Sequence, residues 1–496
     1  MNLPNAPRIT LSAWFEKHVA IDFLVYFRIV FGGVMLWWAW KYLAYDLVGL
    51  FYIEPAFHFH YDGFAWVREW PGEGSRLEFY ILVLCSLLIV LGYFYRVAAI
   101  VFACGFTHLF LVDKSLYQNH YYLTCLLAWL LAILPANAAF SIDAWQRPTI
   151  RRDTAPLWML RLLQFQIAVP YFFGGIAKLN ADWLAGQPMG LALSERTWFP
   201  LIGPWLDETW FAVLFAWGGM LLDLLIAPAL WWRKTRLFAY LAAVLFHLTN
   251  AALWTIGVFP WLMILATAVF FPPDWPRRLW ASLRNTQAEI ETVERSVGWN
   301  FSRRLTALAL FFYLGWQCLL PLRHYAFPGN ASWTEEGHHF AWHMLLRGKK
   351  CGIRYYAFDP RTGRTGVVDL RRYITMHQST RFGRDPRMIR QLALFIADDL
   401  RGKGFPEIEI RVLAWVSLNG RKPQMLMDPR ADLGNPRESF QASWILPLTE
   451  PLPETPWNAP LIEWERHLKL PRHFQLAQNP PSAPTSPSTG EAPGQP

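Results

Sequence analysis

The stretch YFFGGIAKLNADW, residues 171–183, places a lysine, Lys178, at the end of an almost wholly apolar run. That run starts near residue 157 and is long enough to cross a bilayer as an α-helix, which needs roughly 20 mainly apolar residues. An ammonium at such a helix end can reach out to the membrane surface, or it can serve a site inside the protein. The location of the other polar and charged residues in the sequence bears on which of these two roles Lys178 has.

The composition is that of a membrane protein, because 54% of the 496 residues are hydrophobic and only 17% carry charge. Several apolar runs approach the length of a membrane span. They fall near 21–42, 77–95, 97–112, 120–138, 157–177, 209–231, 237–254, 257–272 and 305–322. Some are short or nearly continuous with a neighbour, so they predict nine spans, or eight with one broken or re-entrant helix.

Basic residues fall on one side of this predicted bundle. If residues 1–20 form a cytoplasmic segment, every loop rich in Lys and Arg lies in the cytoplasm, as the positive-inside rule requires. The opposite loops, such as DKSLYQNH (113–120) and NADWLAGQPM (180–189), are poor in Lys and Arg. We therefore predict an integral, multi-pass membrane protein whose N terminus is cytoplasmic.

The chain divides into four predicted parts. The cytoplasmic segment 1–20 precedes a transmembrane bundle over 21–322, and an extracytoplasmic soluble domain over 323–475 follows it. Residues 476–496 are rich in Pro and Ser without large hydrophobic side chains, which predicts disorder. The net charge of +9 follows from the basic loops and a basic soluble domain, so no nucleic-acid partner is needed to explain it.

The soluble domain carries signals for both strands and a helix. Two strand-like runs flank a turn at Gly363, and Asp385 is a plausible N-cap for a helix that begins with a proline. The dipeptide Asn419-Gly420 after an alternating run is a strong hairpin signal. The predicted fold class is a membrane α-helical bundle followed by a smaller α+β, β-rich soluble domain.

Polar residues gather at the outer level of the predicted bundle, where Lys178 ends the fifth span. The other members of this level are Asp113, Lys114, Asn119, His120, His247 and Asn250. Arg28 lies within the first span, where a charge costs about 2.5–3.5 kcal/mol on insertion scales, so it is expected to face a partner inside the protein. Together these residues predict a polar site in the outer half of the bundle.

Each of these residues also has a structural interpretation. Lys178 could snorkel from its helix end, and His120 and His247 could be hydrogen-bonded packing residues. Asp113 beside Lys114 could form an interfacial ion pair of little energetic weight. The sequence has no HExxH motif and no clustered Cys/His spacing, so no metal site is predicted.

Residues 171–189, YFFGGIAKLNADWLAGQPM, resemble the signature segment of vitamin K-dependent gamma-glutamyl carboxylases. In that family a lysine in a G-x-x-K-L-x-A-D-W context is the base that starts the reaction. FLVDKSLYQNHYYLTCLLAW (110–129) and FAWHMLLR (340–347) resemble further family segments in the same order, and the likeness covers about residues 20–450. Two positions depart from the animal enzymes, since Ala177 replaces a second lysine and Arg347 replaces a histidine. The shorter chain is similar to the bacterial branch of the family.

The resemblance implies an enzyme that uses reduced vitamin K, O₂ and CO₂ as cofactor and co-substrates. Oxygenation of the reduced quinone yields its epoxide and a base strong enough to take the γ-proton of glutamate, and CO₂ then adds to that carbon. Lys178 would be the base that starts this reaction, which requires a neutral amine, and desolvation favours that form. The remaining site residues implied are His120 and His247 in catalysis, and Asn119, Asp113, Asn250, Arg28 and Trp183 around the quinone or substrate.

The implied partners are the lipid bilayer of a bacterial inner membrane, a membrane quinone and an exported polypeptide that contains glutamate. Two alternatives remain open at this point. The protein could be a non-catalytic transporter or assembly factor on the same fold, in which Lys178 is a binding or structural charge. It could also be a quinol epoxidase that does not carboxylate glutamate.

Overall fold

The computed structural model describes residues 17–254, 256–284, 301–436, 443–457 and 459–467. Its contacts divide the chain into two compact units, the first made of residues 1–348 and 374–382 and the second of 349–373 and 383–496. The predicted tail 476–496 and most of the predicted segment 1–20 lie outside the described residues.

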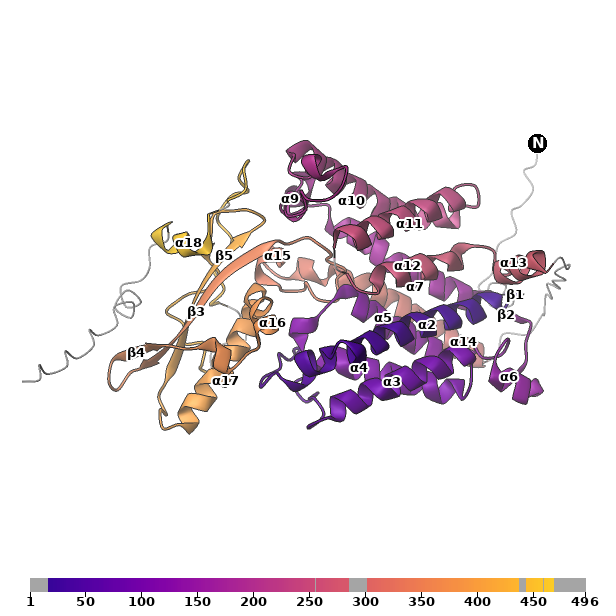
Figure 1. The fold of residues 1–496 in the computed structure, drawn as a ribbon, viewed down its shortest axis with the longest axis horizontal. Coiled ribbons are helices and arrows are strands. Elements are labelled where there is room, and N and C mark those ends of the chain that lie inside the picture. The colour runs from indigo at the N-terminus through magenta and orange to yellow at the C-terminus, as the bar shows by residue number, and fades with distance from the viewer. Residues whose placement is uncertain (1–16, 255, 285–300, 437–442, 458, 468–496) are drawn as a thin grey trace, which may run out of the picture. The chain divides into compact units, whose positions relative to one another are not determined.

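The first unit is helical (Figure 1). Its main helices are α2 (Asp22–Ala44), α3 (Gly74–Leu91), α4 (Tyr95–Val112), α5 (Asn119–Ile133), α7 (Leu157–Ala177), α10 (Thr209–Trp231), α11 (Arg236–Leu253), α12 (Phe259–Thr267) and α14 (Phe301–Leu319). Each predicted apolar run overlaps one of these helices. The shorter elements are α6 (Ile142–Gln146), α8 (Ala181–Leu184), α9 (Met189–Ser194), α13 (Trp275–Leu283), α15 (Ala331–Thr334), α16 (Met376–Ser379) and the paired strands β1 (His18–Ala20) and β2 (Thr154–Pro156).

Six helices of the described chain are long and apolar enough to cross a membrane, namely α2, α3, α4, α10, α11 and the segment Ser302–Ala326, which includes most of α14. Helix α5 and the segment Phe259–Phe270 are apolar but shorter. Helix α7 has 21 residues but includes Arg161, Gln164 and Gln166, which reduce its apolar character. The chain is therefore a multi-pass membrane protein, and the count of eight or nine spans stays a prediction.

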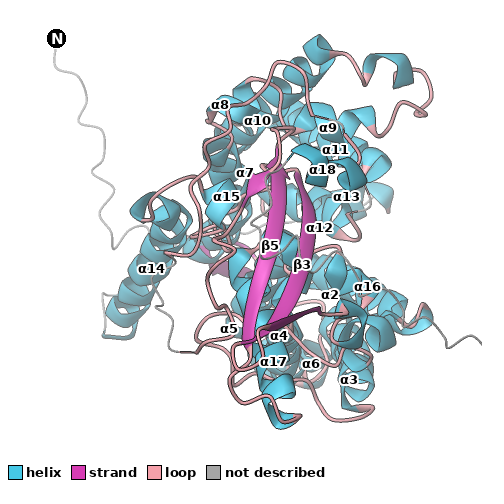
Figure 2. Cartoon of the chain, turned by 90° about the vertical axis from the view of Figure 1, so that its left-hand side faces the viewer, coloured by secondary structure: helices cyan, strands magenta, loops and turns pink. Residues whose placement is uncertain are grey.

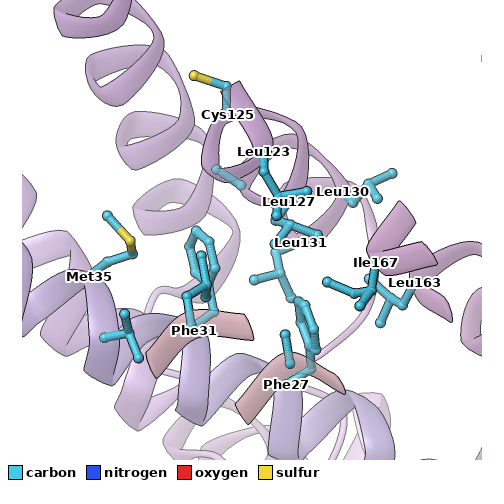
Figure 3. Packing of buried hydrophobic residues seen from close by; sticks show 14 of the residues in the cluster. Phe27, Phe31, Met35, Leu123, Cys125, Leu127, Leu130, Leu131, Leu163 and Ile167 are labelled. Atoms are coloured by element: carbon cyan, nitrogen blue, oxygen red, sulfur yellow. The ribbon is translucent and has the colours of Figure 1, made fainter. Parts of the chain in front are cut away.

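The core of the bundle forms where α2, α5 and α7 meet. Figure 3 shows Phe27 and Phe31 of α2 close to Leu127 and Leu131 of α5, with Ile167 of α7 beside them. All five side chains are at most 1% exposed. Close packing of buried side chains holds the helices in a fixed arrangement, since protein cores tolerate little shift.

The second unit is built on a four-stranded antiparallel sheet in the order β4-β3-β5-β6. The two long strands β3 (Lys349–Asp359) and β5 (Glu409–Leu418) run side by side in Figure 2, and the outer strands are β4 (Arg364–Val367) and β6 (Gln424–Met425). Helix α17 (Pro386–Gly402) packs against β5, and a cluster with Trp464 of α18 (Leu461–His467) includes side chains from β3 and β5. The chain thus has a helical N-terminal region followed by a smaller region with a β-sheet, as the predicted fold class requires.

Local signals in this unit predicted its elements well. The turn at Gly363, which has a positive φ of 68°, joins β3 to β4. Asp385 caps α17 by accepting a hydrogen bond from the Arg387 amide at 2.8 Å. Asn419 and Gly420 both have positive φ, 53° and 79°, as a tight hairpin turn requires, and they follow directly on β5.

Candidate functional site

Lys178 lies at the C-terminal end of α7, and its ammonium forms a buried ion pair with Asp223 of α10. Lys178 is 5% exposed and Asp223 is 2% exposed. A charge at such a position is costly unless it is paired, so the two side chains stabilise each other's ionised forms. Lys178 therefore points into the protein, and it does not snorkel outward.

The two glycines of the GGIAK sequence make this pairing possible. A Cβ on Gly175 would lie 2.9 Å from the backbone nitrogen of Leu224 and 2.7 Å from its Cγ, so α7 and α10 approach with almost no space between them. A Cβ on Gly174 would lie 2.8 Å from Met344 Cε and 3.6 Å from the Asp223 carboxylate. Small residues let helices in membranes approach closely, and here that approach brings Asp223 to Lys178.

Trp183 forms a wall beside the ammonium. Asn180 caps α8 by accepting from the Trp183 amide at 3.0 Å, and the Trp183 indole donates to the Ala216 carbonyl of α10 at 2.8 Å. These bonds hold the ring with its centroid 5.2 Å from Lys178 Nζ, within the range of a cation–π contact. The LNADW sequence thus positions one aromatic face against the lysine.

His247 of α11 contacts the face of α7 that carries Lys178, at a point two helical turns before the lysine. Its Nε2 lies 2.6 Å from the hydroxyl of Tyr171, which is also 3.3 Å from Thr267 Oγ1. Tyr171, Gly174 and Lys178 share one face of α7 because they are three and four residues apart. The other ring nitrogen, Nδ1 of His247, is buried and has no hydrogen-bond partner among the described residues. It is therefore a polar atom that a ligand oxygen could satisfy.

His120 and His247 meet through an aromatic ring. The His120 ring stacks on Phe259 of α12 with centroids 5.2 Å apart, and the His247 ring meets the same phenyl edge-on at 5.7 Å. Asn250 lies three residues after His247 on α11 and is 9% exposed. The structure thus brings both predicted histidines together around Phe259.

The segment 335–348 contacts α5 and α7 beside these groups and has an unusual backbone conformation. Phe340, Trp342 and Leu345 have positive φ values of 63°, 59° and 57°, which bulky side chains rarely adopt. Asn119 donates to the His343 carbonyl at 3.0 Å, and Trp342 packs on Tyr122 with centroids 5.0 Å apart. Backbone strain of this kind persists only when the surroundings hold it, and it concentrates at functional sites.

A buried polar cluster supports this segment. The Nδ1 atoms of His338 and His343 are 3.2 Å apart, so one ring donates to the other. Arg347 pairs with buried Glu335 at 3.0 Å. Burial and the neighbouring His324 and Arg347 lower the pKa of His343 to about 3, so its ring is neutral at ordinary pH.

Asp113 is engaged with neighbouring loops. It follows α4 and accepts hydrogen bonds from the Ser115 amide at 2.7 Å and from Gln378 Nε2 at 3.0 Å. His58 Nδ1 lies 3.1 Å from the same carboxylate, and although burial lowers the pKa of His58, this contact raises it above its ordinary value overall. Through Gln378, Asp113 holds the segment 374–382 within the first unit.

Arg28 does not join the other predicted residues. Its guanidinium donates to the carbonyls of Ala136 at 2.9 Å and of Ala139 at 3.3 Å, which follow the C-terminal end of α5. His120 lies at the other end of α5, about 20 Å away along the helix axis. Arg28 thus has partners inside the protein, as expected, but these are backbone carbonyls at the opposite end of α5 from His120.

Three groups of this site were not predicted as site residues from the sequence. They are Asp223, Tyr171 and the Trp342–Met344 segment. The signal for Asp223 was present, because it is a lone carboxylate inside a 23-residue apolar helix, where an ionisable residue indicates function and a partner. Tyr171 and Trp342 carried no such signal, since aromatic side chains are common in apolar helices and cores. Among the described residues, no group of three or more His, Cys, Asp or Glu could hold a metal ion.

Comparison with known families assigns most of the chain. A family model described as the HTTM domain matches residues 17–275, slightly more than half of the sequence. A second model, described as the vitamin K-dependent gamma-carboxylase lumenal domain, matches residues 302–451. No solved structure matches the chain.

Proposed function

Because the chain belongs to the vitamin K-dependent gamma-glutamyl carboxylase family, we propose that it couples oxygenation of a reduced membrane quinone to carboxylation of glutamate in an exported polypeptide. The observation that carries this proposal is the buried Lys178–Asp223 pair, which lies beside Trp183. Lys178 ends the face of α7 that holds Tyr171, the partner of His247 on α11. When bound, reduced vitamin K would supply, by its reaction with O₂, the strong base that glutamate deprotonation requires.

The side chains present suit an aromatic diol. Trp183, Phe259 and Trp342 offer apolar ring surfaces, and the site is buried, as a prenylated ligand that arrives from the bilayer would need. His247 Nδ1 has no hydrogen-bond partner in the described part of the chain. When the Tyr171 hydroxyl donates to Nε2, the ring proton lies on Nδ1 and can be donated to a ligand oxygen. Lys178 can receive a proton from a hydroxyl of that ligand.

Asp223 gives the lysine a way to be neutral. In a buried pair that shares one proton, the proton can lie on either partner, because burial reduces the advantage of the ionised state over the neutral one. With the proton on Asp223, the Lys178 amine can take a proton from a bound hydroxyl and become an ammonium next to the resulting anion. The residues of 335–348 would exclude water from this step, which protects a strong base from being quenched.

The competing proposal is a non-catalytic role on the same fold, either transport or assistance to exported proteins. One observation favours it, because the charge of Lys178 is already neutralised by Asp223, as expected of a lysine with a structural role. A third possibility is a quinol epoxidase, which would share the oxygenation step with the first proposal but would not carboxylate glutamate.

One assay separates these proposals. Membranes that contain the protein are incubated with reduced vitamin K, O₂, labelled bicarbonate and a glutamate peptide, and the epoxide and the fixed label are followed separately. We expect both products to form. Epoxide without fixed label would identify an epoxidase, and neither product from a folded protein would favour the non-catalytic role.

A further inference from the structure

A second basic site lies at the opposite end of α7 from Lys178. A cavity of about 520 Å³ opens between α7, α10, α11 and α14, and its lining includes Trp158, Arg161, Phe165, Trp231, Arg236 and Leu314. Arg161 lies 17 residues before Lys178 in the sequence, so at 1.5 Å per residue the two are about 25 Å apart along the helix. None of the predicted site residues lines this cavity.

Two guanidinium groups face this cavity without a negative partner. Arg161 donates to the side-chain oxygen of Gln164 at 2.8 Å, and Arg236 donates to the carbonyls of Leu230 at 2.9 Å and Trp231 at 3.3 Å. All of these acceptors are neutral. Within the part of the chain that the structure describes, no carboxylate pairs with either arginine. The cavity thus presents two positive charges that an anion can neutralise.

The walls of the cavity suit a lipid. Trp158 and Trp231 lie near the ends of their helices, beside the basic loop that holds Arg233 and Lys234, as aromatic residues do at a membrane interface. Arg161 and Trp231 are also exposed on the surface of the bundle, so the cavity is open to the side. Leu314 of α14 provides an apolar surface along which an acyl chain can lie.

We propose that this cavity binds the phosphate headgroup of an anionic phospholipid. Arg161 and Arg236 would contact the phosphate, the two tryptophans would flank the glycerol region, and an acyl chain would pack on α14. A basic pocket between helices on the side of the basic loops is the usual setting for such lipids. A free phosphate has the same charge but no chain, so the test has to distinguish the two.

The test is native mass spectrometry of the detergent-purified protein titrated with phosphatidylglycerol or phosphatidylcholine. We expect at least a tenfold preference of the wild type for phosphatidylglycerol, and loss of that preference in the Arg161→Gln/Arg236→Gln double variant. Leu314→Trp keeps both charges but fills the apolar part of the cavity, so it should weaken phosphatidylglycerol binding as well. Inorganic phosphate at the same concentration should not compete.

A matched control removes the same number of charges next to the cavity. Arg233→Gln/Lys234→Gln lies in the adjoining loop and outside the lining, and it should keep the preference. The proposal is overturned if this control loses the preference as much as the cavity variant does. It is also overturned if Leu314→Trp binds like the wild type, or if inorganic phosphate displaces the lipid. Melting temperatures of all variants identify any that are misfolded. If the double variant is among them, the single variants Arg161→Gln and Arg236→Gln replace it, and each should lower the preference for phosphatidylglycerol.

Discussion

The carboxylate of Asp223 changes what a substitution at Lys178 should do. Both groups are buried, and removing one partner of a buried ion pair typically costs 3–5 kcal/mol because the other charge is left without compensation. From the sequence alone, loss of Lys178 would remove only a proton acceptor. The structure indicates that stability and activity would both fall, so the two effects have to be separated.

A neutral double variant separates them. Lys178→Met alone should lower the stability of the purified protein, by an amount on the order of 3 kcal/mol, because Asp223 stays buried and unpaired. Lys178→Met/Asp223→Asn should regain most of that stability, since no isolated charge remains, yet it should form no epoxide. Thermal unfolding and epoxide formation are measured on both. Near-normal epoxide formation by the stable double variant would exclude Lys178 as the base.

Lys178→Arg tests the proton transfer itself. A guanidinium keeps its proton at any working pH and can still pair with Asp223, so the fold should be retained. Epoxide formation should nevertheless fall by a factor of 100 or more, which is typical for the loss of a general base. A lysine with a purely structural role predicts the reverse, namely an arginine variant that works as well as the wild type.

His343 predicts a dependence of stability on pH. Burial, with the nearby positive charges, lowers the pKa of His343 from 6.5 to about 3, so below pH 6.5 the unfolded chain takes up a proton that the folded protein excludes. The contribution of neutral His343 to the free energy of unfolding is therefore fully present above about pH 6.5. It is lost as the pH falls toward 3, by at most about 1.4 kcal/mol per pH unit. The melting temperature of the wild type should fall between pH 7.5 and pH 5, and His343→Asn should reduce that slope. Equal slopes for the two proteins would contradict this role.

At the scale of elements, the contact between α7 and α10 decides whether the site can form. It rests on Gly174 and Gly175, where even one added methyl group would overlap Met344 or the backbone at Leu224. Overpacking of this kind costs about 1–3 kcal/mol when helices are forced apart. The motif GGIAK thus encodes the helix contact as well as the lysine.

Gly175→Ala should therefore lower both stability and epoxide formation, because it separates Lys178 from Asp223. Gly218→Ala on α10 is the matched control, since its added Cβ would have no atom within 4 Å. That change should leave activity intact and can raise stability by up to about 1 kcal/mol, since alanine favours helix more than glycine does. Melting temperature and epoxide yield are compared for the pair. The interpretation fails if the two alanine variants behave alike.

At the scale of the whole molecule, the orientation in the membrane remains a prediction from the basic loops. Reporter fusions after residues 115, 150, 185, 235 and 330 should read outside, inside, outside, inside and outside. A cytoplasmic signal at 330 would invert the second half of the bundle and separate Lys178 from the segment 335–348 across the membrane. Fusions in a variant with the basic residues of 147–152 neutralised provide the control, because a topology set by these charges should then weaken.

The two units of the chain differ in how far local signals predicted them. In the second unit, a turn at Gly363, a cap at Asp385 and a hairpin at Asn419 were all correct, because each depends on a few neighbouring residues and their φ angles. In the bundle, the positions of the apolar runs were correct. The number of spans was harder to judge, because length and apolarity vary continuously and α5 and α12 fall below the length of a full span.

The sequence by itself determined that this is a multi-pass membrane protein of the carboxylase family, since hydrophobic length and family segments are local properties of the chain. It also predicted Lys178, His120 and His247 as catalytic residues. Only the tertiary structure decided their partners: Asp223 for the lysine, Tyr171 for His247, and Phe259 between the two histidines. It likewise showed that Arg28 binds the Ala136 carbonyl and does not join the other predicted site residues. The reason is that a partner in a membrane bundle comes from another helix, 45 residues away for Lys178 and 76 for Tyr171, and helix packing, which local sequence does not specify, selects it.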